Sequence, residues 1–160
     1  MITAYSGAEV VEIAVQIESC GEAFYEEAQS QARSQKAKEI FSYLRDEERR
    51  HAKIFEEMLS GIGDIEASWR HDEEYQGYMH ALAENRVFPS PEAARDIVRN
   101  LTDDESAVRY ALGFEKDTIL FFHELRSLVR EKDQSVIDEL IAEERRHIRT
   151  LNGMLQAMAN

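Results

Sequence analysis

Apolar residues recur at three- and four-residue spacing along most of the chain, which is the pattern of amphipathic helices. Only seven Gly and two Pro interrupt this pattern in 160 residues, so we predict a nearly all-helical single domain. Four long segments carry the periodicity, and each would be roughly 35 Å long as a helix. These predicted helices cover residues 6–30, 35–59, 103–130 and 134–157.

Local sequence signals mark the ends of the long helices. The first helix is expected to begin with a capping box that pairs Ser6 with Glu9. The third is expected to begin with the same motif at Thr102 and Glu105. The second should stop at the glycines of residues 61–63, because Gly favours helix termination.

The lengths of the connections predict how the helices are arranged. Short loops join the first helix to the second and the third to the fourth, which forces two antiparallel hairpins. The crossover of residues 60–102 is long enough to run the length of the bundle. Within it, residues 72–85 predict a helix, and a second short helix should follow Ser90, its N-cap, with Pro91 in first position. The residues expected to share one side of the first crossover helix are Tyr75, Tyr78, Met79 and Leu82.

A repeated motif divides the chain into two related halves. Residues 47–51 read Glu-Glu-Arg-Arg-His, and residues 143–147 repeat these five residues. In both copies a Met-Leu pair begins seven residues after the His. A closely similar offset aligns Glu18 with Glu115. The chain therefore consists of a helix pair and its diverged copy, each with one Glu on its first helix and a Glu-x-x-His on its second.

The apolar stripe of each long helix is interrupted near its middle by ionisable residues. On the second helix, Leu44 precedes and Phe55 follows the stripe positions that Glu48 and His51 occupy. The other three helices show the same interruption, so we expect six ionisable groups to point into the core of the bundle. They are Glu18, Glu48, His51, Glu115, Glu144 and His147.

Six buried ionisable groups require compensation. Burying one unpaired carboxylate costs several kcal/mol, and six such groups would exceed the roughly 5–15 kcal/mol stability of an ordinary domain. Two divalent cations would balance four carboxylates. Oxygen donors mixed with imidazole suit iron or manganese better than the sulfur-rich sites of structural zinc. The sequence therefore predicts a two-metal centre, with two iron ions as the expected cofactor and manganese or a mixed pair as the alternative.

The order and symmetry of these motifs resemble the di-iron domain of the rubrerythrins, within the ferritin-like superfamily. The resemblance covers all four long helices and implies a ferritin-like four-helix bundle. It also implies that each half of the repeat binds one iron ion, with some of the Glu side chains bridging the pair. The matching motifs are Glu18 followed by Phe24 and Tyr25, Glu48-x-x-His51, Glu115 followed by Phe121 and Phe122, and Glu144-x-x-His147.

Two features depart from the rubrerythrins that act as peroxidases. Those proteins carry a further Glu three residues beyond the ligand of the third helix, where this sequence has Thr118. They also carry a Cys-rich rubredoxin domain, whereas Cys20 is the single cysteine here and is expected to be a small buried residue. Electrons would therefore have to come from an external redox donor.

The resemblance implies that the di-iron centre reacts with dioxygen or hydrogen peroxide. We expect a peroxide reductase active in oxidative stress or a ferrous-iron oxidase, both of them oxidoreductases. The alternatives are a non-catalytic iron-binding or sensing module and a subunit of an iron-storage assembly. A homodimer is expected, and the long crossover would allow its hairpins to be exchanged between chains.

Tyr25 is the candidate catalytic residue outside the metal ligands. It lies seven residues after Glu18 on the same helix face, so it is expected to hydrogen-bond a ligand, to take part in redox chemistry, or only to pack. Glu47 and Glu143 lie off the apolar stripes and are expected at the surface or behind the ligands. The remaining histidines, expected to be partly exposed, are His71, His80 and His123.

Charge and hydropathy restrict the possible partners. A net charge of −13 argues against nucleic acid and anionic membrane surfaces. No apolar run has the length of a membrane span. Glu9 and Glu12 lie where a signal peptide would need a basic end and an apolar stretch, so we expect a cytoplasmic protein.

Overall fold

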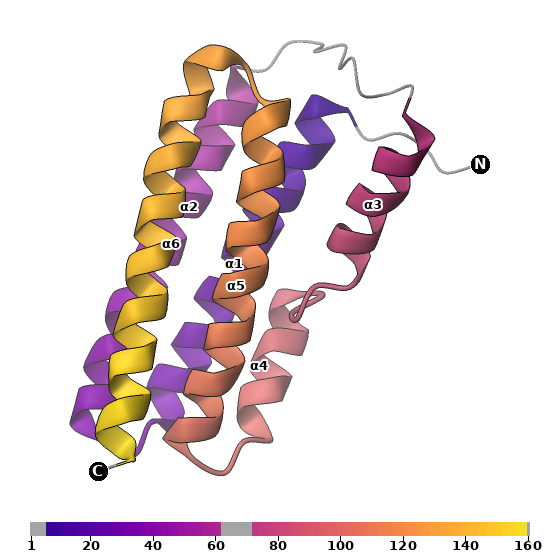
Figure 1. Ribbon diagram of the computed structural model, residues 1–160. Coiled ribbons are helices and arrows are strands. Elements are labelled where there is room, and N and C mark those ends of the chain that lie inside the picture. The colour runs from indigo at the N-terminus through magenta and orange to yellow at the C-terminus, as the bar shows by residue number, and fades with distance from the viewer. Residues whose placement is uncertain (1–5, 62–71, 160) are drawn as a thin grey trace.

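The computed structural model describes residues 6–61 and 72–159, and these two ranges contain six helices and no strand. The all-helical prediction is therefore confirmed. Four long helices lie side by side and form a bundle, and two short helices lie along one side of it (Figure 1). The long helices are α1 (Gly7–Gln31), α2 (Gln35–Ser60), α5 (Asp104–Leu128) and α6 (Glu131–Met158), and the short ones are α3 (Glu73–Glu84) and α4 (Pro91–Arg99).

The long helices pair as the connection lengths predicted. Helix α1 packs chiefly against α2, and α5 packs chiefly against α6, which gives the two hairpins. Helix α4 packs against α1. Two hydrogen bonds connect helix α3 to α5. The Tyr75 and Tyr78 hydroxyl groups both donate to the Glu124 carboxylate, with oxygen–oxygen distances of 2.9 and 3.1 Å.

Capping explains where α1 and α5 begin. The capping box of α1 is confirmed, because the Ser6 and Glu9 side chains each accept the other residue's backbone N–H. The predicted box at Thr102 is wrong. Asp103 is the N-cap of α5, and its carboxylate accepts the Ser106 N–H at 2.7 Å. A charged carboxylate at the positive end of a helix competes well against a threonine hydroxyl one residue earlier.

The turn between α5 and α6 is tighter than predicted. Helix α5 ends at Leu128 instead of residue 130, and α6 begins at Glu131 instead of Gln134. Arg130 stabilises this turn by donating to Asp133 at 2.7 Å and to the Gly61 carbonyl at 2.8 Å. The acidic residues in the first turn of α6 also favour the earlier start through the helix dipole.

Gly61 is the C-cap of α2, while the predicted stop at Gly63 lies outside the described residues. Ser90 and Pro91 begin α4 as predicted. Helix α3 also matches its predicted range, but its predicted apolar side is only partly correct. Tyr78 is 39% exposed, since its hydroxyl reaches Glu124 at the edge of the bundle. The side chains that α3 buries are those of Gln76, Met79 and Ala83.

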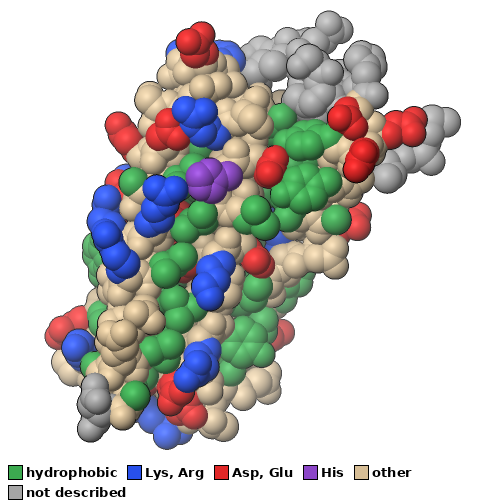
Figure 2. Space-filling view, in the orientation of Figure 1, with side chains coloured by type: hydrophobic (Ala, Val, Ile, Leu, Met, Phe, Trp, Pro, Cys, Tyr) green, Lys and Arg blue, Asp and Glu red, His purple; other side chains and the backbone are tan. Residues whose placement is uncertain are grey.

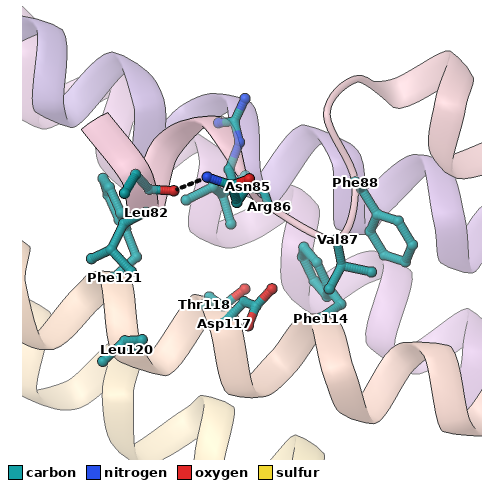
Figure 3. A pocket seen from close by; sticks show the side chains of 12 residues that line it. Leu82, Asn85, Arg86, Val87, Phe88, Phe114, Asp117, Thr118, Leu120 and Phe121 are labelled. Atoms are coloured by element: carbon teal, nitrogen blue, oxygen red, sulfur yellow. Dashed lines mark hydrogen bonds between the residues drawn. The ribbon is translucent and has the colours of Figure 1, made fainter. Parts of the chain in front are cut away.

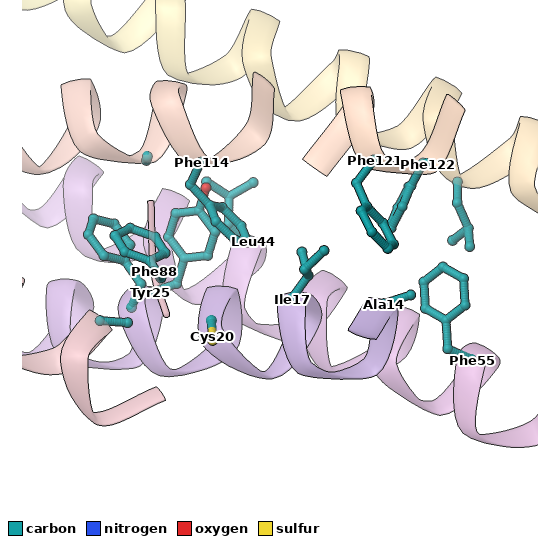
Figure 4. Packing of buried hydrophobic residues seen from close by; sticks show 14 of the residues in the cluster. Ala14, Ile17, Cys20, Tyr25, Leu44, Phe55, Phe88, Phe114, Phe121 and Phe122 are labelled. Carbon is teal, nitrogen blue, oxygen red and sulfur yellow. The ribbon is translucent and has the colours of Figure 1, made fainter. Parts of the chain in front are cut away.

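Aromatic side chains form two apolar layers separated along the bundle axis (Figure 4). In one layer, the Phe88 ring stacks on Phe24 and Phe114, with centroids 4.8 and 5.0 Å apart. In the other, Phe55 and Phe122 pack with ring centroids 5.1 Å apart. The ionisable residues lie between these two layers, at the middle of the bundle.

Acidic and basic side chains are interspersed over the face shown in Figure 2, where apolar side chains also form a lengthwise band. Large apolar residues at the described surface include Tyr110 and Leu120 of α5, at 43% and 45% exposure. None of the described helices combines the length and the apolar content that a membrane crossing requires.

Candidate metal centre

The six ionisable residues predicted to face the core all do so, at the middle of the four long helices. Each is at most 1% exposed. Helices α1 and α5 contribute one Glu each, and α2 and α6 contribute a Glu and a His three residues apart. Residues three apart lie on the same side of a helix, so both members of each Glu-x-x-His pair reach the same space.

The two imidazole rings lie at the centre of this cluster. They are nearly parallel, with centroids 5.7 Å apart and an angle of 13° between their planes. His51 Nδ1 lies 2.8 Å from Glu144 Oε1 and 3.3 Å from Glu18 Oε2. His147 Nδ1 lies 2.9 Å from Glu144 Oε2, and the nearest Glu48 and Glu115 oxygens are 3.4 and 3.5 Å away.

These side chains form two overlapping sets of possible metal ligands, within each of which the donor atoms lie at most 4.8 Å apart. Glu48 and Glu144 belong to both sets. Each set therefore contains one His, one Glu of its own and two shared Glu. The two sets would hold two neighbouring ions, and Glu48 and Glu144 would be available to both. The first set is Glu18, Glu48, His51 and Glu144, and the second is Glu48, Glu115, Glu144 and His147.

The donor groups fit a pair of cations. Although the atoms lie close together, most of them have no hydrogen bond of acceptable geometry within the described part of the chain. Leaving so many buried polar atoms without partners is costly unless something else binds them. Carboxylate oxygens with imidazole nitrogens are donors that divalent iron and manganese accept. The atoms without partners include both oxygens of Glu18, Glu48 and Glu144, Glu115 Oε2, and Nδ1 of His51 and His147.

Burial and mutual repulsion dominate the electrostatics of the metal-free cluster. Burial raises the pKa values of Glu48 and Glu115 well above the usual value, and nearby carboxylates raise them further. Burial also raises the pKa of Glu18. Burial acts in the same direction on Glu144, but the nearby imidazoles of His147 and His51 outweigh it and lower the pKa of that carboxyl. Burial alone would lower the pKa of His51, but Glu144 and Glu18 raise it to about 12. The cluster thus holds protons where metal ions would supply positive charge.

Tyr25 contacts one of these carboxylates directly. Its hydroxyl is fully buried and donates a hydrogen bond to Glu115 Oε1. Burial and the adjacent Glu115 carboxylate keep the pKa of Tyr25 well above its usual value, so the phenol remains a donor. Of the roles considered for Tyr25, the structure shows the hydrogen bond to a candidate ligand.

Glu143 lies behind one of the histidines. Its Oε2 is 2.8 Å from His51 Nε2, and Arg50 donates to the same oxygen. With the proton on His51 Nε2, Nδ1 is free to face the carboxylate cluster. The sequence placed Glu143 at the surface or behind the ligands, but its spacing from His147 did not indicate that it would reach His51 on a different hairpin.

Gly21 lies beside the cluster at a position that the sequence motifs did not indicate. A Cβ atom there would lie 2.7 Å from Glu48 Oε2 and 2.8 Å from the Phe114 ring. Glycine therefore leaves room for one of the shared carboxylates. The repeat contained a signal for this position, because the offset that aligns Glu18 with Glu115 also aligns Gly21 with Thr118.

None of the remaining candidates that the structure describes belongs to these two ligand sets, although Glu47 lies near His51 and Glu143. Cys20 is buried, and burial raises its pKa to about 11, which makes it a poor nucleophile. The carboxylate of Glu47 pairs with Arg50 at 3.0 Å. His123 is exposed and His80 is partly buried, while His71 lies outside the described residues.

Comparisons with known proteins agree with the fold and with the type of site. The family model described as Rubrerythrin matches residues 9–97, more than half of the chain. A crystal structure from Thermotoga maritima, described as that of a ferritin-like diiron-carboxylate protein, superposes with a TM-score of 0.71. The two sequences are 24% identical, and the alignment covers 98% of each chain. No curated protein matches the chain.

Proposed function

Because the chain belongs to the rubrerythrin family, we propose that it is a di-iron oxidoreductase that reduces a peroxide or dioxygen while ferrous iron is oxidised. The observation that carries this proposal is the convergence of six buried ionisable side chains into two ligand sets that share Glu48 and Glu144. Two bound ferrous ions would supply the two electrons needed to reduce an O–O bond, one electron each.

Shared carboxylates suit a centre that changes its charge during turnover. Glu48 and Glu144 belong to both ligand sets, whereas Glu18 and Glu115 each belong to one. A carboxylate can bind through one oxygen or through both, so these Glu can adjust as the charge changes. The buried position of all four keeps their interactions strong, since bulk water does not screen them.

Residues around the ligands hold and orient them. Tyr25 donates to Glu115, which fixes one oxygen of that carboxylate and places a proton beside the centre. Glu143 fixes the orientation of the His51 ring through Nε2. The aromatic layers on either side exclude bulk water, so a reactive oxygen species formed there would meet few competing partners.

Rapid mixing of ferrous-loaded, oxygen-free protein with hydrogen peroxide or with dioxygen tests the proposal. We expect visible absorption of ferric iron to appear within one turnover, with two irons oxidised per peroxide consumed. With a small-molecule reductant in excess, many turnovers are expected. A single slow oxidation with no further turnover would instead favour an iron-binding or sensing module, the alternative that Thr118 supports by replacing a carboxylate.

Two further parts of the proposal concern partners. Reducing equivalents are proposed to come from a redox centre outside these 160 residues, because the sequence contains only one cysteine and that one is buried. A homodimer is proposed as the assembly, and light scattering at several protein concentrations tests it. A very large particle in that measurement would indicate a storage assembly instead.

A further inference from the structure

A cavity of about 90 Å³ lies beside the metal centre, between α5 and the segment that joins α3 to α4 (Figure 3). Residue Ile17 of α1 closes its inner side. Its other lining residues come from the end of α3, from residues 85–88, and from residues 114–121 of α5. The cavity therefore lies where the crossover covers the bundle.

Residues of the inner wall of this cavity are neighbours, in the sequence, of the candidate metal ligands. Ile17 directly precedes Glu18, and Phe114 directly precedes Glu115. Thr118 lies three residues after Glu115, on the same side of α5. A molecule in the cavity would thus be separated from the carboxylate cluster by the thickness of these side chains.

Thr118 supplies an unused polar group at this wall. Its side chain is 1% exposed, and Oγ1 has no hydrogen-bond partner among the described residues. Figure 3 shows Thr118 and Asp117 together on α5, facing the segment that carries Val87. A buried hydroxyl without a partner is costly, so this hydroxyl is suited to bind a ligand oxygen.

The other polar side chains that line the cavity are those of Asn85, Arg86 and Asp117. The Asn85 amide donates to the Ala81 carbonyl at 2.9 Å. Burial raises the pKa of Asp117, and the nearby Val87 N–H partly offsets this effect. In Figure 3 the Arg86 side chain extends away from α5, and its buried Nε and Nη1 have no hydrogen-bond partner among the described residues.

The rest of the wall is aromatic or aliphatic, with Leu82, Val87 and Phe121 among its members. The cavity is smaller than the roughly 150 Å³ apolar cavity that accommodates benzene. An apolar body of a few carbon atoms with one oxygen-bearing end matches this shape and chemistry.

We propose that this cavity binds a short-chain organic hydroperoxide, with its alkyl group against the apolar wall and its peroxide oxygens at Thr118 beside the metal centre. The proposal rests on the proposed di-iron function, for which it names the substrate class. The hydroperoxide O–O bond breaks, two ferrous ions give up one electron each, and two protons complete one alcohol and one water molecule.

Ala81 offers a way to block the cavity without altering the metal ligands. It lines the cavity, yet it is an exposed residue of α3, so Ala81→Leu should fill the opening and keep the helix. Ala157→Leu, at an exposed position near the end of α6, is the matched control. At the inner wall, Thr118→Val removes the hydroxyl at nearly constant volume, and Thr118→Ser retains it.

Single-turnover oxidation of the ferrous protein by tert-butyl hydroperoxide and by hydrogen peroxide provides the first readout. Ala81→Leu should slow the tert-butyl hydroperoxide reaction about tenfold, because the alkyl group loses its site. The hydrogen peroxide reaction should slow much less, because hydrogen peroxide has no alkyl group that needs the cavity. Thr118→Val should slow the tert-butyl hydroperoxide reaction roughly fivefold, because one hydrogen bond is lost. Thr118→Ser retains the hydroxyl and should restore the rate.

Binding of tert-butanol, the product of that reaction, provides a second readout that needs no turnover. In zinc-loaded protein, tert-butanol should shift the methyl resonances of Ile17 and Leu82 in a saturable manner. The shifts should disappear in Ala81→Leu and persist in Ala157→Leu.

The outcomes separate the two proposals. If neither peroxide oxidises the wild-type ferrous protein, the di-iron function is wrong and the substrate assignment fails with it. If both peroxides react but Ala81→Leu slows them equally or not at all, the cavity assignment alone is overturned. Absence of saturable tert-butanol shifts in the wild type overturns it as well.

Discussion

The α1–α2 hairpin and the α5–α6 hairpin each bring two Glu and one His to the centre, yet the two histidines have different neighbours at Nε2. His51 Nε2 lies 2.8 Å from Glu143, whereas His147 Nε2 has no hydrogen-bond partner in the described ranges. The repeat pairs Glu143 with Glu47, but Glu47 contacts Arg50 instead of His147. A carboxylate behind a metal-binding imidazole makes it a stronger ligand. The two metal positions should therefore differ in affinity.

Two other pairs of equivalent positions also differ between the hairpins. Tyr25 donates to Glu115, while its counterpart Phe122 has no hydroxyl to offer Glu18. Gly21 makes room for Glu48, while its counterpart Thr118 faces the cavity. The six candidate ligands follow the symmetry of the repeat, whereas the residues that surround them differ between the two hairpins. The symmetry thus accounts for the two candidate ligand sets, and the departures from it make the surroundings of the two sets different.

Removing the metal should have the largest effect, because it acts on both halves at once. A ligand that binds only the folded state at a hundredfold excess over its Kd stabilises it by about 2.7 kcal/mol. For a domain of this size, that corresponds to a decrease in melting temperature of roughly 5–10 °C on metal removal at pH 7. Calorimetry of metal-free and ferrous-loaded protein measures this difference in melting temperature. Replacing Glu18 and Glu115 together by Gln should reduce this difference in melting temperature. The metal-free form loses repulsion between carboxylates, and the loaded form loses two metal ligands.

Gly21→Ala should be the most damaging single substitution in this comparison. The added methyl group would force Glu48 or Phe114 to move, and Glu48 belongs to both ligand sets. We expect both metal positions to weaken, by about tenfold or more, in a ferrous titration followed by calorimetry.

Gly153→Ala is the matched control, because a methyl group there meets nothing within 4 Å. It should leave metal binding intact and stabilise the helix by about 0.4–1 kcal/mol. Equal metal affinity in the Gly21 and Gly153 variants would show that Gly21 does not determine the position of Glu48.

Glu143→Gln should weaken one metal position selectively. Loss of the carboxylate behind His51 is expected to lower the affinity of that position about 10–100-fold. Glu47 lies near His51 and Glu143 but is hydrogen-bonded to Arg50, so the equivalent Glu47→Gln should change affinity by less than about fivefold. Two-step metal titrations of both variants measure the difference. Identical titrations would mean that the asymmetry at Nε2 has no effect on binding.

Tyr25→Phe should have the smallest effect. The variant makes this position resemble Phe122 of the other half and removes one hydrogen bond to Glu115. Such a bond contributes about 1 kcal/mol, so affinity at the second position should fall roughly fivefold. Spectroscopy of the ferric protein should detect the altered Glu115. An unchanged spectrum and an unchanged affinity would restrict Tyr25 to a packing role.

The sequence predicted the parts of the structure that depend on periodicity and repetition. Helix number, hairpin pairing and the inward orientation of Glu18, Glu48 and His51 all follow from stripes that a 3.6-residue period defines. Because the second half repeats the first, the same reasoning predicted the inward orientation of the equivalent residues there. Helix ends were less certain, because Thr102 and Asp103 are both acceptable caps and only the folded backbone decides between them.

Contacts between hairpins could not be predicted from spacing along one helix. Glu143 reaches His51 because α6 packs beside α2, and that distance depends on the packing of the whole bundle. Gly21 required knowledge of where Glu48 lies in space. The cavity at Thr118 depends on how the crossover covers α5, which no short motif encodes.

Metal analysis after anaerobic reconstitution with ferrous iron tests the central claim most directly. Reconstituted protein freed of excess iron should contain two metal ions per 160-residue chain, one for each ligand set. The binding isotherm should resolve a tighter and a weaker step, and Glu143→Gln should weaken the tighter one. A stoichiometry of one or zero would contradict the assignment of these six side chains as a two-metal centre.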